Sequence, residues 1–428
     1  MQGFFTKKQT QSKTRPNGKV LSCSACGLHR NCESPRMTEY GGFKKGILNI
    51  GEAPTEVDDV KGLPFQGKQG RLLERTYKKL GVDLFEDCLN VYACHCLPTD
   101  DGKVRNAKPN EIECCRKNTL QIIEKYHPKV VVLFGHAAIY SVIGNHWKKD
   151  LVGSAKSKYG SVFKWRGFTI PDQEYKTWIC PIFSPSHVEQ MEGGVEETIW
   201  KQDLRQAVEM LNVNFPVHVE PTIEIIEDLE ELNNIVFETK QFGQIKANVP
   251  SNKTIAFDYE TTGKKPHAQG HKIICASVAD SENHVYAFML PEERSKRKPF
   301  VKILADPMVR KIAHNMKFEE TWSKVKLRQS VAGWETDTMQ MAHILDNRRG
   351  VSGLKFQTYV NFGIADYSSE IEPWLMSVDP KDGNSLNRIE ELLTKAGGKG
   401  KLLKYCALDS IYEYRLSKLQ KISINQNG

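Results

Sequence analysis

The chain has 428 residues, of which 39% are hydrophobic and 26% are charged, and its formal net charge is +8. This length predicts two or three domains, and the composition excludes a disordered chain. No apolar run is as long as a membrane span and no signal peptide opens the sequence, so we expect a cytoplasmic protein without a membrane partner. The basic charge is compatible with a polyanionic partner but does not by itself identify one.

The N-terminal residues predict a tail followed by an α/β domain. Residues 1–20 are polar and basic, which is typical of a flexible arm. Between residues 21 and 212, the apolar runs Ile47–Ile50 and Val130–Phe134 predict buried strands, and helical patterns follow at Gln69–Leu80 and His136–Ile143. This alternation favours a mostly parallel sheet covered by helices.

Cysteines are concentrated in this first part of the chain. Eight of the eleven cysteines precede residue 120, which in a cytosolic chain indicates metal or cluster binding rather than disulfides. Cys23 and Cys26 form a close pair of the kind that binds zinc or an iron–sulfur cluster. The candidates for the two remaining ligands are Cys94 or Cys96 together with Cys114 or Cys115.

A glycine-rich, acidic loop follows the first predicted strand. It runs as GEAPTEVDD at 51–59 and continues as GLPFQGKQG at 62–70, between a strand and a helix. Clefts at the carboxyl ends of strands are where α/β sheets bind ligands. An aromatic residue beside such a cleft, here Phe65, can stack on a flipped base.

Four segments of residues 20–212 resemble the family-four uracil-DNA glycosylases, which carry a four-iron cluster: CSACGL, the GEAP loop with GLPF, LNVYAC at 89–94 and PNEIECC at 109–115. The resemblance implies a 4Fe-4S cluster, with zinc as the alternative, whose ligands are Cys23, Cys26, Cys94 and Cys115. It also implies that Phe65 stacks on uracil, that Asn90 reads its Watson–Crick edge, and that Glu52 and Asp58 are the functional acids.

Two positions depart from this family. Thr55 replaces the glycine that ends the GEAPG loop, and Ser184 stands where the family has a histidine that donates to the uracil oxygen. Losing one such donor typically lowers a rate by ~100-fold or more, and His187 lies three residues too late to match the motif. Two hypotheses follow for this domain: it excises uracil, or it is a catalytically inactive, cluster-bearing DNA-binding module.

The second half begins with a connecting segment. Residues 213–253 predict a linker, a helix with an acidic start over Glu227–Thr239, and a loop through Pro250. A second α/β pattern then runs over residues 254–428, opening on a buried strand that contains Asp258 and Glu260. Because strand side chains alternate, these two carboxylates point the same way, and a divalent metal between them would relieve their repulsion.

Three further residues complete a candidate metal centre. Glu319 follows a short apolar strand, and the predicted helix Lys401–Lys421 places Tyr405 and Asp409 four residues apart on one face. Asp258, Glu260, Glu319 and Asp409 could hold two divalent metals, Mg²⁺ or Mn²⁺, about 4 Å apart. The hydroxyl of Tyr405 could then orient the attacking water.

Three ordered motifs in residues 220–425 resemble the tyrosine subclass of the DEDD exonucleases, the proofreading domain of bacterial and phage family A DNA polymerases. The motifs are FDYETTG, HNMKFE and YCALD, and Glu319 departs from the aspartate usual in the second motif. The resemblance implies a ribonuclease-H-like fold and 3′→5′ removal of nucleotides from single-stranded DNA ends. Related enzymes process RNA, so an RNA-directed exonuclease is the alternative.

The order of the two domains resembles the front of a phage-type family A DNA polymerase. About twenty residues follow Asp409, too few for a polymerase domain. We therefore expect either a separate polymerase polypeptide as a partner, in a bacterial or phage-infected cell, or a chain that is a fragment of a longer enzyme.

Overall fold

The computed structural model describes residues 23–147, 160–191, 193–242, 245–250 and 253–427. The chain divides into two compact units, Met1–Pro216 and Val217–Gly428, which are described separately below. The basic arm expected at 1–20 lies outside the described residues. Among the described helices, none combines the length and the apolar character needed to cross a membrane.

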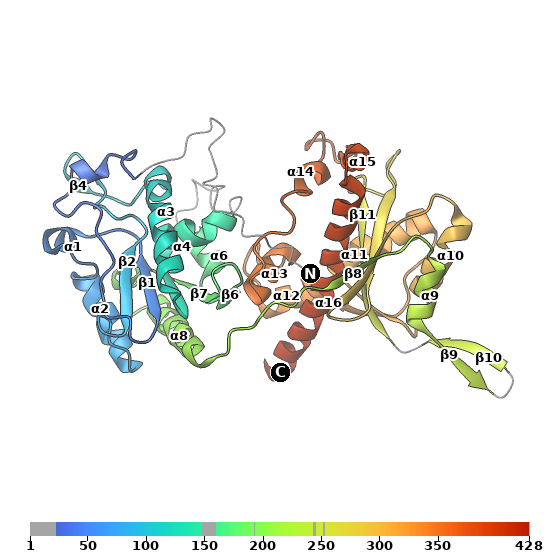
Figure 1. The fold of residues 1–428 in the computed structure, drawn as a ribbon, viewed down its shortest axis with the longest axis horizontal. Helices are drawn as coiled ribbons and strands as arrows, with labels where there is room; N and C mark the ends of the chain where they lie inside the picture. Colours follow the sequence, from blue (N-terminus) through green and yellow to red (C-terminus); the bar gives the residue numbers. More distant parts are fainter. Residues whose placement is uncertain (1–22, 148–159, 192, 243–244, 251–252, 428) are drawn as a thin grey trace. The chain divides into compact units, whose positions relative to one another are not determined.

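A five-stranded sheet forms the centre of the N-terminal unit (Figure 1). Its strand order is β2-β1-β5-β7-β6, and all neighbours are parallel except β6 and β7. Both predicted strands are confirmed, as β1 and β5, and the α/β class of the unit is confirmed with them. The strands are β1 (Ile47–Gly51), β2 (Cys88–Tyr92), β5 (Val130–Phe134), β6 (Ile170–Asp172) and β7 (Thr177–Ile182).

Helices connect these strands, and the two predicted helices are confirmed as α2 and α4. Two very short strands, β3 (Thr99–Asp100) and β4 (Lys103–Val104), form a separate hairpin. The helices are α1 (Glu56–Lys61), α2 (Lys68–Lys79), α3 (Pro109–Tyr126), α4 (Gly135–His146), α6 (Gly160–Trp165), α7 (Pro185–Gln190) and α8 (Val195–Glu209), with short 3-10 turns at Leu28–Arg30 and Met210–Asn212.

The C-terminal unit is built on a six-stranded mixed sheet in the order β15-β14-β11-β12-β13-β8. Strand β12 runs antiparallel to both of its neighbours, whereas the other adjacent pairs are parallel. The strands are β8 (Thr222–Ile225), β11 (Thr254–Thr261), β12 (Ile273–Ala279), β13 (His284–Met289), β14 (Arg310–Ala313) and β15 (Trp334–Asp337).

The segment 213–253 contains more regular structure than a linker and a helix. Strand β8 joins the six-stranded sheet, and helix α9 covers only Glu230–Val236. Phe237–Phe242 (β9) and Ile245–Pro250 (β10) pair as an antiparallel hairpin where the end of the helix and a loop were expected. The sequence IKANV at 245–249 alternates apolar and polar residues, which is a strand pattern that the helix-and-loop interpretation overlooked.

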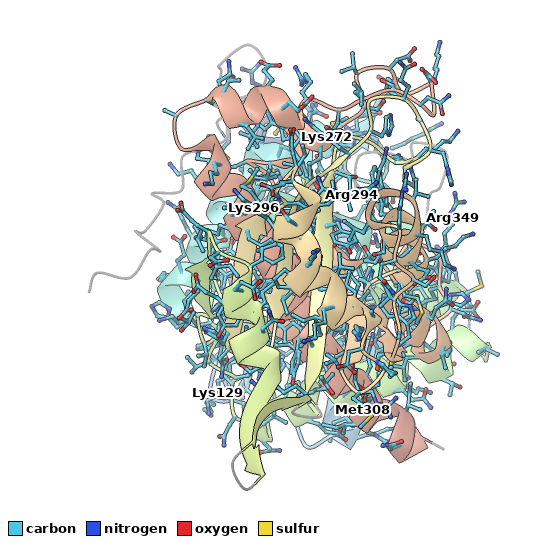
Figure 2. The ribbon with its side chains drawn as sticks, turned by 90° about the vertical axis from the view of Figure 1, so that its right-hand side faces the viewer. Lys129, Lys272, Arg294, Lys296, Met308 and Arg349 are labelled. Atoms are coloured by element: carbon cyan, nitrogen blue, oxygen red, sulfur yellow. The ribbon has the colours of Figure 1, made fainter. Side chains whose placement is uncertain are left out.

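Helices cover both faces of the six-stranded sheet, and β11 shows the alternation. Phe257 and Tyr259 pack in a core with Phe300 of α10, whereas Ala256 belongs to a second core with Leu402 of α16. The start of α10 faces the viewer in Figure 2, where Arg294 and Lys296 mark it. The helices are α10 (Arg294–Ala305), α11 (Met316–Trp322), α12 (Thr338–Leu345), α13 (Leu354–Phe362), α14 (Glu372–Leu375), α15 (Ile389–Thr394) and α16 (Gly398–Asn427), with a π-helical turn at Ser323–Leu327.

Candidate functional sites

Strand β11 carries the first two candidate metal ligands, Asp258 and Glu260. Both lie on the face of Ala256, which packs toward α16. One ligand atom each of Asp258, Glu260 and Cys406 lie within 4.8 Å of one another. The two carboxylates are therefore close enough to share one cation, as their spacing predicted.

Helix α16 brings Tyr405 and Asp409 to the same place. The two side chains are one turn apart and nearly buried, at 8% and 7% exposure. Asp409 Oδ1 accepts hydrogen bonds from the Tyr367 hydroxyl at 2.7 Å and from the Lys355 ammonium. Lys355 Nζ also lies 4.1 Å and 4.2 Å from the ring centres of Tyr367 and Tyr405, so it can make cation–π contacts with both rings.

Glu319 reaches the centre from α11, which follows a turn held by Asp337. Asn315 precedes α11 with a φ of 76°, and the backbone N–H groups of Asn315 and Met316 donate to the Asp337 carboxylate at 3.1 Å and 3.0 Å. Asp337 also caps the following helix through Met339 N–H, at 3.0 Å. Glu319 is only 2% exposed, and its Oε2 has no hydrogen-bond partner among the described residues.

The electrostatics of this centre favour a divalent cation. Burial raises the pKa of Asp258 well above its ordinary value, and the neighbouring Asp409 raises it further. Burial and then the charge of Asp258 raise the pKa of Glu260 and of Glu319 in the same way. Oxygen ligands that repel one another in a buried place fit hard divalent metals, so the donor set is consistent with metal binding.

Several residues at this centre were not identified from the sequence. Lys355 and Tyr367 contact Asp409, while Cys406 Sγ lies 3.8 Å from Asp258 Oδ2. Glu413, one helical turn beyond Asp409, is 1% exposed. Its four-residue spacing from Asp409 was the one available signal, whereas nothing in the sequence indicated that residue 355 would reach Asp409.

In the N-terminal unit, Phe65 lies at the carboxyl end of the parallel strands. Its ring centre is 5.1 Å from that of Tyr92, the last residue of β2, and 6.1 Å from that of Phe134, the last residue of β5. Phe65 has a φ of 57°, an unfavourable conformation for a bulky residue, and its backbone N–H donates to the Tyr92 hydroxyl at 3.0 Å. Gly70 makes this turn possible, because a Cβ there would lie 1.7 Å from Phe65 O.

Glu52 lies beside the start of α4. Ala137 N–H donates to Glu52 Oε1 at 3.3 Å, and the Ser184 hydroxyl donates to the same carboxylate. Gly135 permits this approach, because its φ is 83° and a Cβ there would lie 2.6 Å from Glu52 Cδ. Burial raises the pKa of Glu52 despite these donors. Ser184 thus contacts a functional acid of the predicted site, while His187 N–H donates to Ser184 Oγ at 3.3 Å within α7.

Asp58 holds the GEAP loop together. Its carboxylate accepts hydrogen bonds from Thr55 N–H at 2.8 Å, Thr55 Oγ1 at 2.7 Å, Gln66 N–H at 2.6 Å and the Tyr92 hydroxyl at 2.8 Å. Thr55, the departure from the family's glycine, is also the N-cap of α1. With 1% exposure and these donors, Asp58 fixes the loop around Phe65, and its role as a functional acid stays a prediction.

Asn90 lies inside the sheet, not at its carboxyl edge. It is fully buried, its Nδ2 donates to Leu84 O at 2.8 Å, and its Oδ1 accepts from Asn49 Nδ2 at 3.0 Å. Tyr77 completes this network by donating to Asn49 Oδ1 at 2.7 Å. Because its amide already has these partners, the geometry gives no support to the predicted uracil-reading role of Asn90.

Seven cysteines gather around η1 (Leu28–Arg30), the loop after β2 and the start of α3. Three pairs of thiols interact directly: Cys94 with Cys115, Cys26 with Cys114, and Cys32 with Cys96. Burial raises the pKa of Cys96 and of Cys114 to about 12. All are free thiols, so the donor set fits a zinc ion or an iron–sulfur cluster, and both Cys114 and Cys115 stay candidates.

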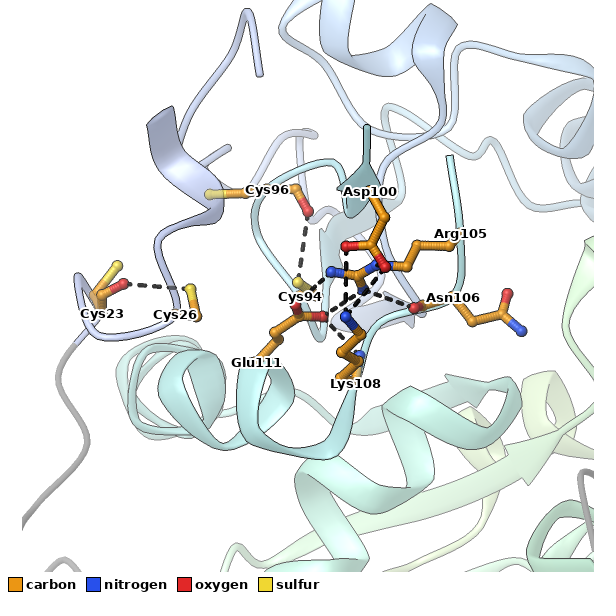
Figure 3. A network of polar contacts seen from close by, with 9 residues as sticks. All are labelled: Cys23, Cys26, Cys94, Cys96, Asp100, Arg105, Asn106, Lys108 and Glu111. Atoms are coloured by element: carbon orange, nitrogen blue, oxygen red, sulfur yellow. Dashed lines mark hydrogen bonds and ion pairs between the residues drawn. The ribbon is translucent and has the colours of Figure 1, made fainter. Parts of the chain in front are cut away.

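An ion network holds the loop between these cysteines (Figure 3). Arg105 binds the buried Glu111 carboxylate in a fork, with N–O distances of 2.8 Å and 2.6 Å, and its Nε lies 2.8 Å from Asp100. Lys108 N–H also donates to Glu111, at 2.7 Å. This network fixes the segment that connects Cys94 and Cys96 to α3.

Two family models match the chain, one for each unit. Residues 38–209 match the uracil DNA glycosylase superfamily, and residues 223–422 match the 3′-5′ exonuclease family. The type-4 uracil-DNA glycosylase of Archaeoglobus fulgidus is 31% identical over 119 residues, which are 28% of this chain and only 57% of that protein. The type-4 uracil-DNA glycosylase of Thermotoga maritima is 29% identical over 189 residues, which are 44% of this chain and 89% of that protein.

A solved structure, Brucella melitensis NrnC bound to pGG, aligns with a TM-score of 0.33 and 15% identity over 49% of this chain and 84% of that chain. Both resemblances seen in the sequence are confirmed by the family matches. The chain joins an N-terminal domain of the uracil DNA glycosylase superfamily to a C-terminal 3′-5′ exonuclease domain.

Proposed function

We propose that the C-terminal domain hydrolyses DNA from single-stranded 3′ ends, with Asp258, Glu260, Glu319 and Asp409 holding two divalent metals. The observation that carries this proposal is the convergence of these carboxylates from three separate elements into one centre, where Glu319 Oε2 has no hydrogen-bond partner in the part of the chain that the structure describes. When bound, the metals would activate water and stabilise the leaving oxygen.

In the reaction, a water oxygen adds to the terminal phosphorus and the bond from phosphorus to the 3′ oxygen breaks. The shortened strand takes a proton on its new 3′-hydroxyl, and a nucleoside 5′-monophosphate leaves. Burial, and then the charge of Asp409, raises the pKa of Tyr405, so its hydroxyl keeps its proton and can orient the water by hydrogen bonding. Tyr367 and Lys355 fix Asp409 in position through its Oδ1.

Matched DNA and RNA oligonucleotides test the substrate. The full chain and its Asp258→Ala variant would be incubated with each 5′-labelled strand in Mg²⁺ or Mn²⁺. We expect stepwise 3′ shortening of DNA by the wild type and none by the variant. Preferred degradation of RNA would replace the proposal with the RNA-directed alternative, and near-normal activity of Asp258→Ala would refute the assigned centre.

We propose that the N-terminal domain recognises uracil in DNA, with Phe65 stacking on the base and Glu52 beside it. Support comes from the strained Phe65 at the carboxyl end of β1 and from the Glu52 carboxylate at the start of α4. Ser184 donates to Glu52 and cannot supply the charge of the family's histidine. This contact favours base recognition with slow excision or none.

An assay in the Asp258→Ala background separates the two outcomes, because the exonuclease then cannot degrade the strand. A 5′-labelled strand with one internal uracil would be incubated and treated with alkali. Cleavage at the uracil would establish a glycosylase, and Ser184→His would be expected to accelerate it. Binding of the uracil strand without cleavage would establish a recognition module.

We also propose that Cys23, Cys26, Cys94 and Cys115 hold a 4Fe-4S cluster that ties the N-terminal segment to α3. Iron and acid-labile sulfide analysis of Cys115→Ser and Cys114→Ser would test this assignment. Loss of both elements only in Cys115→Ser is the expected result. Loss only in Cys114→Ser would instead identify Cys114 as the fourth ligand. Zinc without sulfide in the wild type would mean that the cysteines bind a zinc ion and not a cluster. A partner polymerase stays a prediction, to be tested by co-purification.

A further inference from the structure

A fifth buried carboxylate lies next to the four proposed ligands. Glu413 follows Asp409 by one helical turn on α16, the helix that packs against β11, β12 and β14. It is 1% exposed, so its charge is as shielded from water as that of Glu319. No sequence motif of the exonuclease centre includes it.

The surroundings of Glu413 place it at the centre rather than elsewhere in the core. Its carboxylate accepts the backbone N–H of His314, at the start of the HNMKFE motif, and it interacts electrostatically with Asp258, Glu319 and Asp409. Its Oε2 is buried and has no hydrogen-bond partner among the described residues, as is also true of Glu319 Oε2. Glu413 thus connects the second motif to the third.

The residues that the structure describes bring little positive charge to this arrangement. Lys355 contributes a cation, through its contact with Asp409. An unpaired buried carboxylate is strongly unfavourable, and Glu413 is surrounded by others. Two divalent cations together with Lys355 would balance the five carboxylates, whereas Lys355 alone would not.

We propose that Glu413 is a fifth carboxylate of the divalent-metal centre and that its free oxygen contributes to metal affinity. This inference rests on the proposed two-metal exonuclease and adds a positioning residue to it. A purely structural Glu413 would need only one oxygen, to accept the His314 N–H. The buried, unpartnered Oε2 has no such structural use.

Glu413→Gln tests the proposal, because glutamine keeps the side-chain length and an oxygen for the His314 N–H but removes the charge. Mn²⁺ binding to metal-free full-length chain would be measured by calorimetry and by the electron paramagnetic resonance signal of free Mn²⁺. We expect Mn²⁺ affinity to fall by about tenfold or more, the lower end of the effects of removing an outer ligand partner. Glu413→Asp, which keeps the charge, should restore part of it.

Melting temperatures measured with and without Mn²⁺ distinguish weaker metal binding from a folding defect. Without metal, Glu413→Gln should melt at or above the wild-type temperature, because it removes a repelled charge, and Mn²⁺ should raise its melting temperature less than that of the wild type. Glu391→Gln, an exposed change in the same domain, serves as the matched control. Wild-type Mn²⁺ affinity and the wild-type thermal shift in Glu413→Gln would overturn the proposal.

Asp258→Asn distinguishes this failure from failure of the proposed function. If Asp258→Asn loses Mn²⁺ binding and exonuclease activity but Glu413→Gln keeps its affinity, only the role of Glu413 is refuted. If Asp258→Asn retains Mn²⁺ binding and exonuclease activity, the metal centre itself is wrongly assigned. The proposed role of Glu413 is then refuted as well.

Discussion

The two candidate sites satisfy their buried carboxylates in opposite ways. In the N-terminal domain, Asp58 accepts hydrogen bonds from Thr55, Gln66 and Tyr92, and Glu111 receives the fork of Arg105. In the exonuclease domain, Glu319 and Glu413 each have a buried oxygen without a partner among the described residues. The first site is assembled by the protein's own donors, whereas the donor set of the second fits a cation from solution.

This difference has a measurable consequence for stability. A ligand that binds only the folded state stabilises it by about 2.7 kcal/mol at one hundred times its dissociation constant. Divalent metals should therefore stabilise the exonuclease domain, while the GEAP loop, whose carboxylates already have donors, should be indifferent to them. The predictions below test this contrast.

The largest effect is expected at the proposed metal centre. Asp258→Asn should reduce exonuclease activity by about 10⁴-fold, the scale seen when a member of a catalytic unit is removed. The rate of 3′ shortening in Mg²⁺ measures this, with the exposed Asp379→Asn as control. A loss below tenfold would mean that the carboxylates do not act as one metal-binding unit.

The second-largest effect is a loss of stability at Asp58, whose carboxylate accepts hydrogen bonds from the protein itself. Asp58→Asn replaces an acceptor-only group with an amide whose NH₂ faces donors, so the N-terminal domain should lose about 2–4 kcal/mol of unfolding free energy. Denaturant unfolding would measure it, and the exposed Asp101→Asn is the control. Exonuclease activity should be unaffected. An unfolding free energy equal to that of the wild type would show that the hydrogen bonds of Asp58 do not hold the loop.

Tyr405→Phe isolates water orientation from metal binding. Removal of the hydroxyl should slow DNA shortening by about 10- to 100-fold, because only one hydrogen bond of the transition state is lost. Mn²⁺ affinity should stay unchanged, since the proposed ligands are carboxylates. A parallel loss of Mn²⁺ affinity would instead make Tyr405 a part of the metal site.

The smallest predicted effect concerns a buried cation that has its own partner. Lys311 on β14 donates to Asp306 O, and burial lowers its pKa from 10.5 to about 8. Between pH 8 and 10.5 the unfolded chain holds this proton and the folded chain does not, so stability should rise with pH in that window. Because one pKa unit corresponds to about 1.4 kcal/mol, the gain of wild type over Lys311→Met should be about 1 kcal/mol per pH unit across this window. A flat difference across the window would refute the lowered pKa.

Local regularities made much of the fold predictable. The apolar runs that became β1 and β5, and the alternation that turns Asp258 and Glu260 to one face of β11, depend only on the strand repeat. The helical repeat likewise brought Tyr405 and Asp409 together on α16. The hairpin at 237–250 was missed because its first strand begins inside the helical pattern assigned to Glu227–Thr239.

Periodicity and motifs are local properties, so they were enough to predict both domain types and to propose the carboxylates of the metal centre. The donors that each buried group meets became visible only in the folded chain. Folding places Asn90 inside the sheet, uses Asp58 to fix a loop and brings Lys355 to an aspartate 54 residues away. It also leaves Glu413 Oε2 without a partner among the residues described. Contacts between distant residues depend on how the elements pack, and no repeat along the chain encodes that packing.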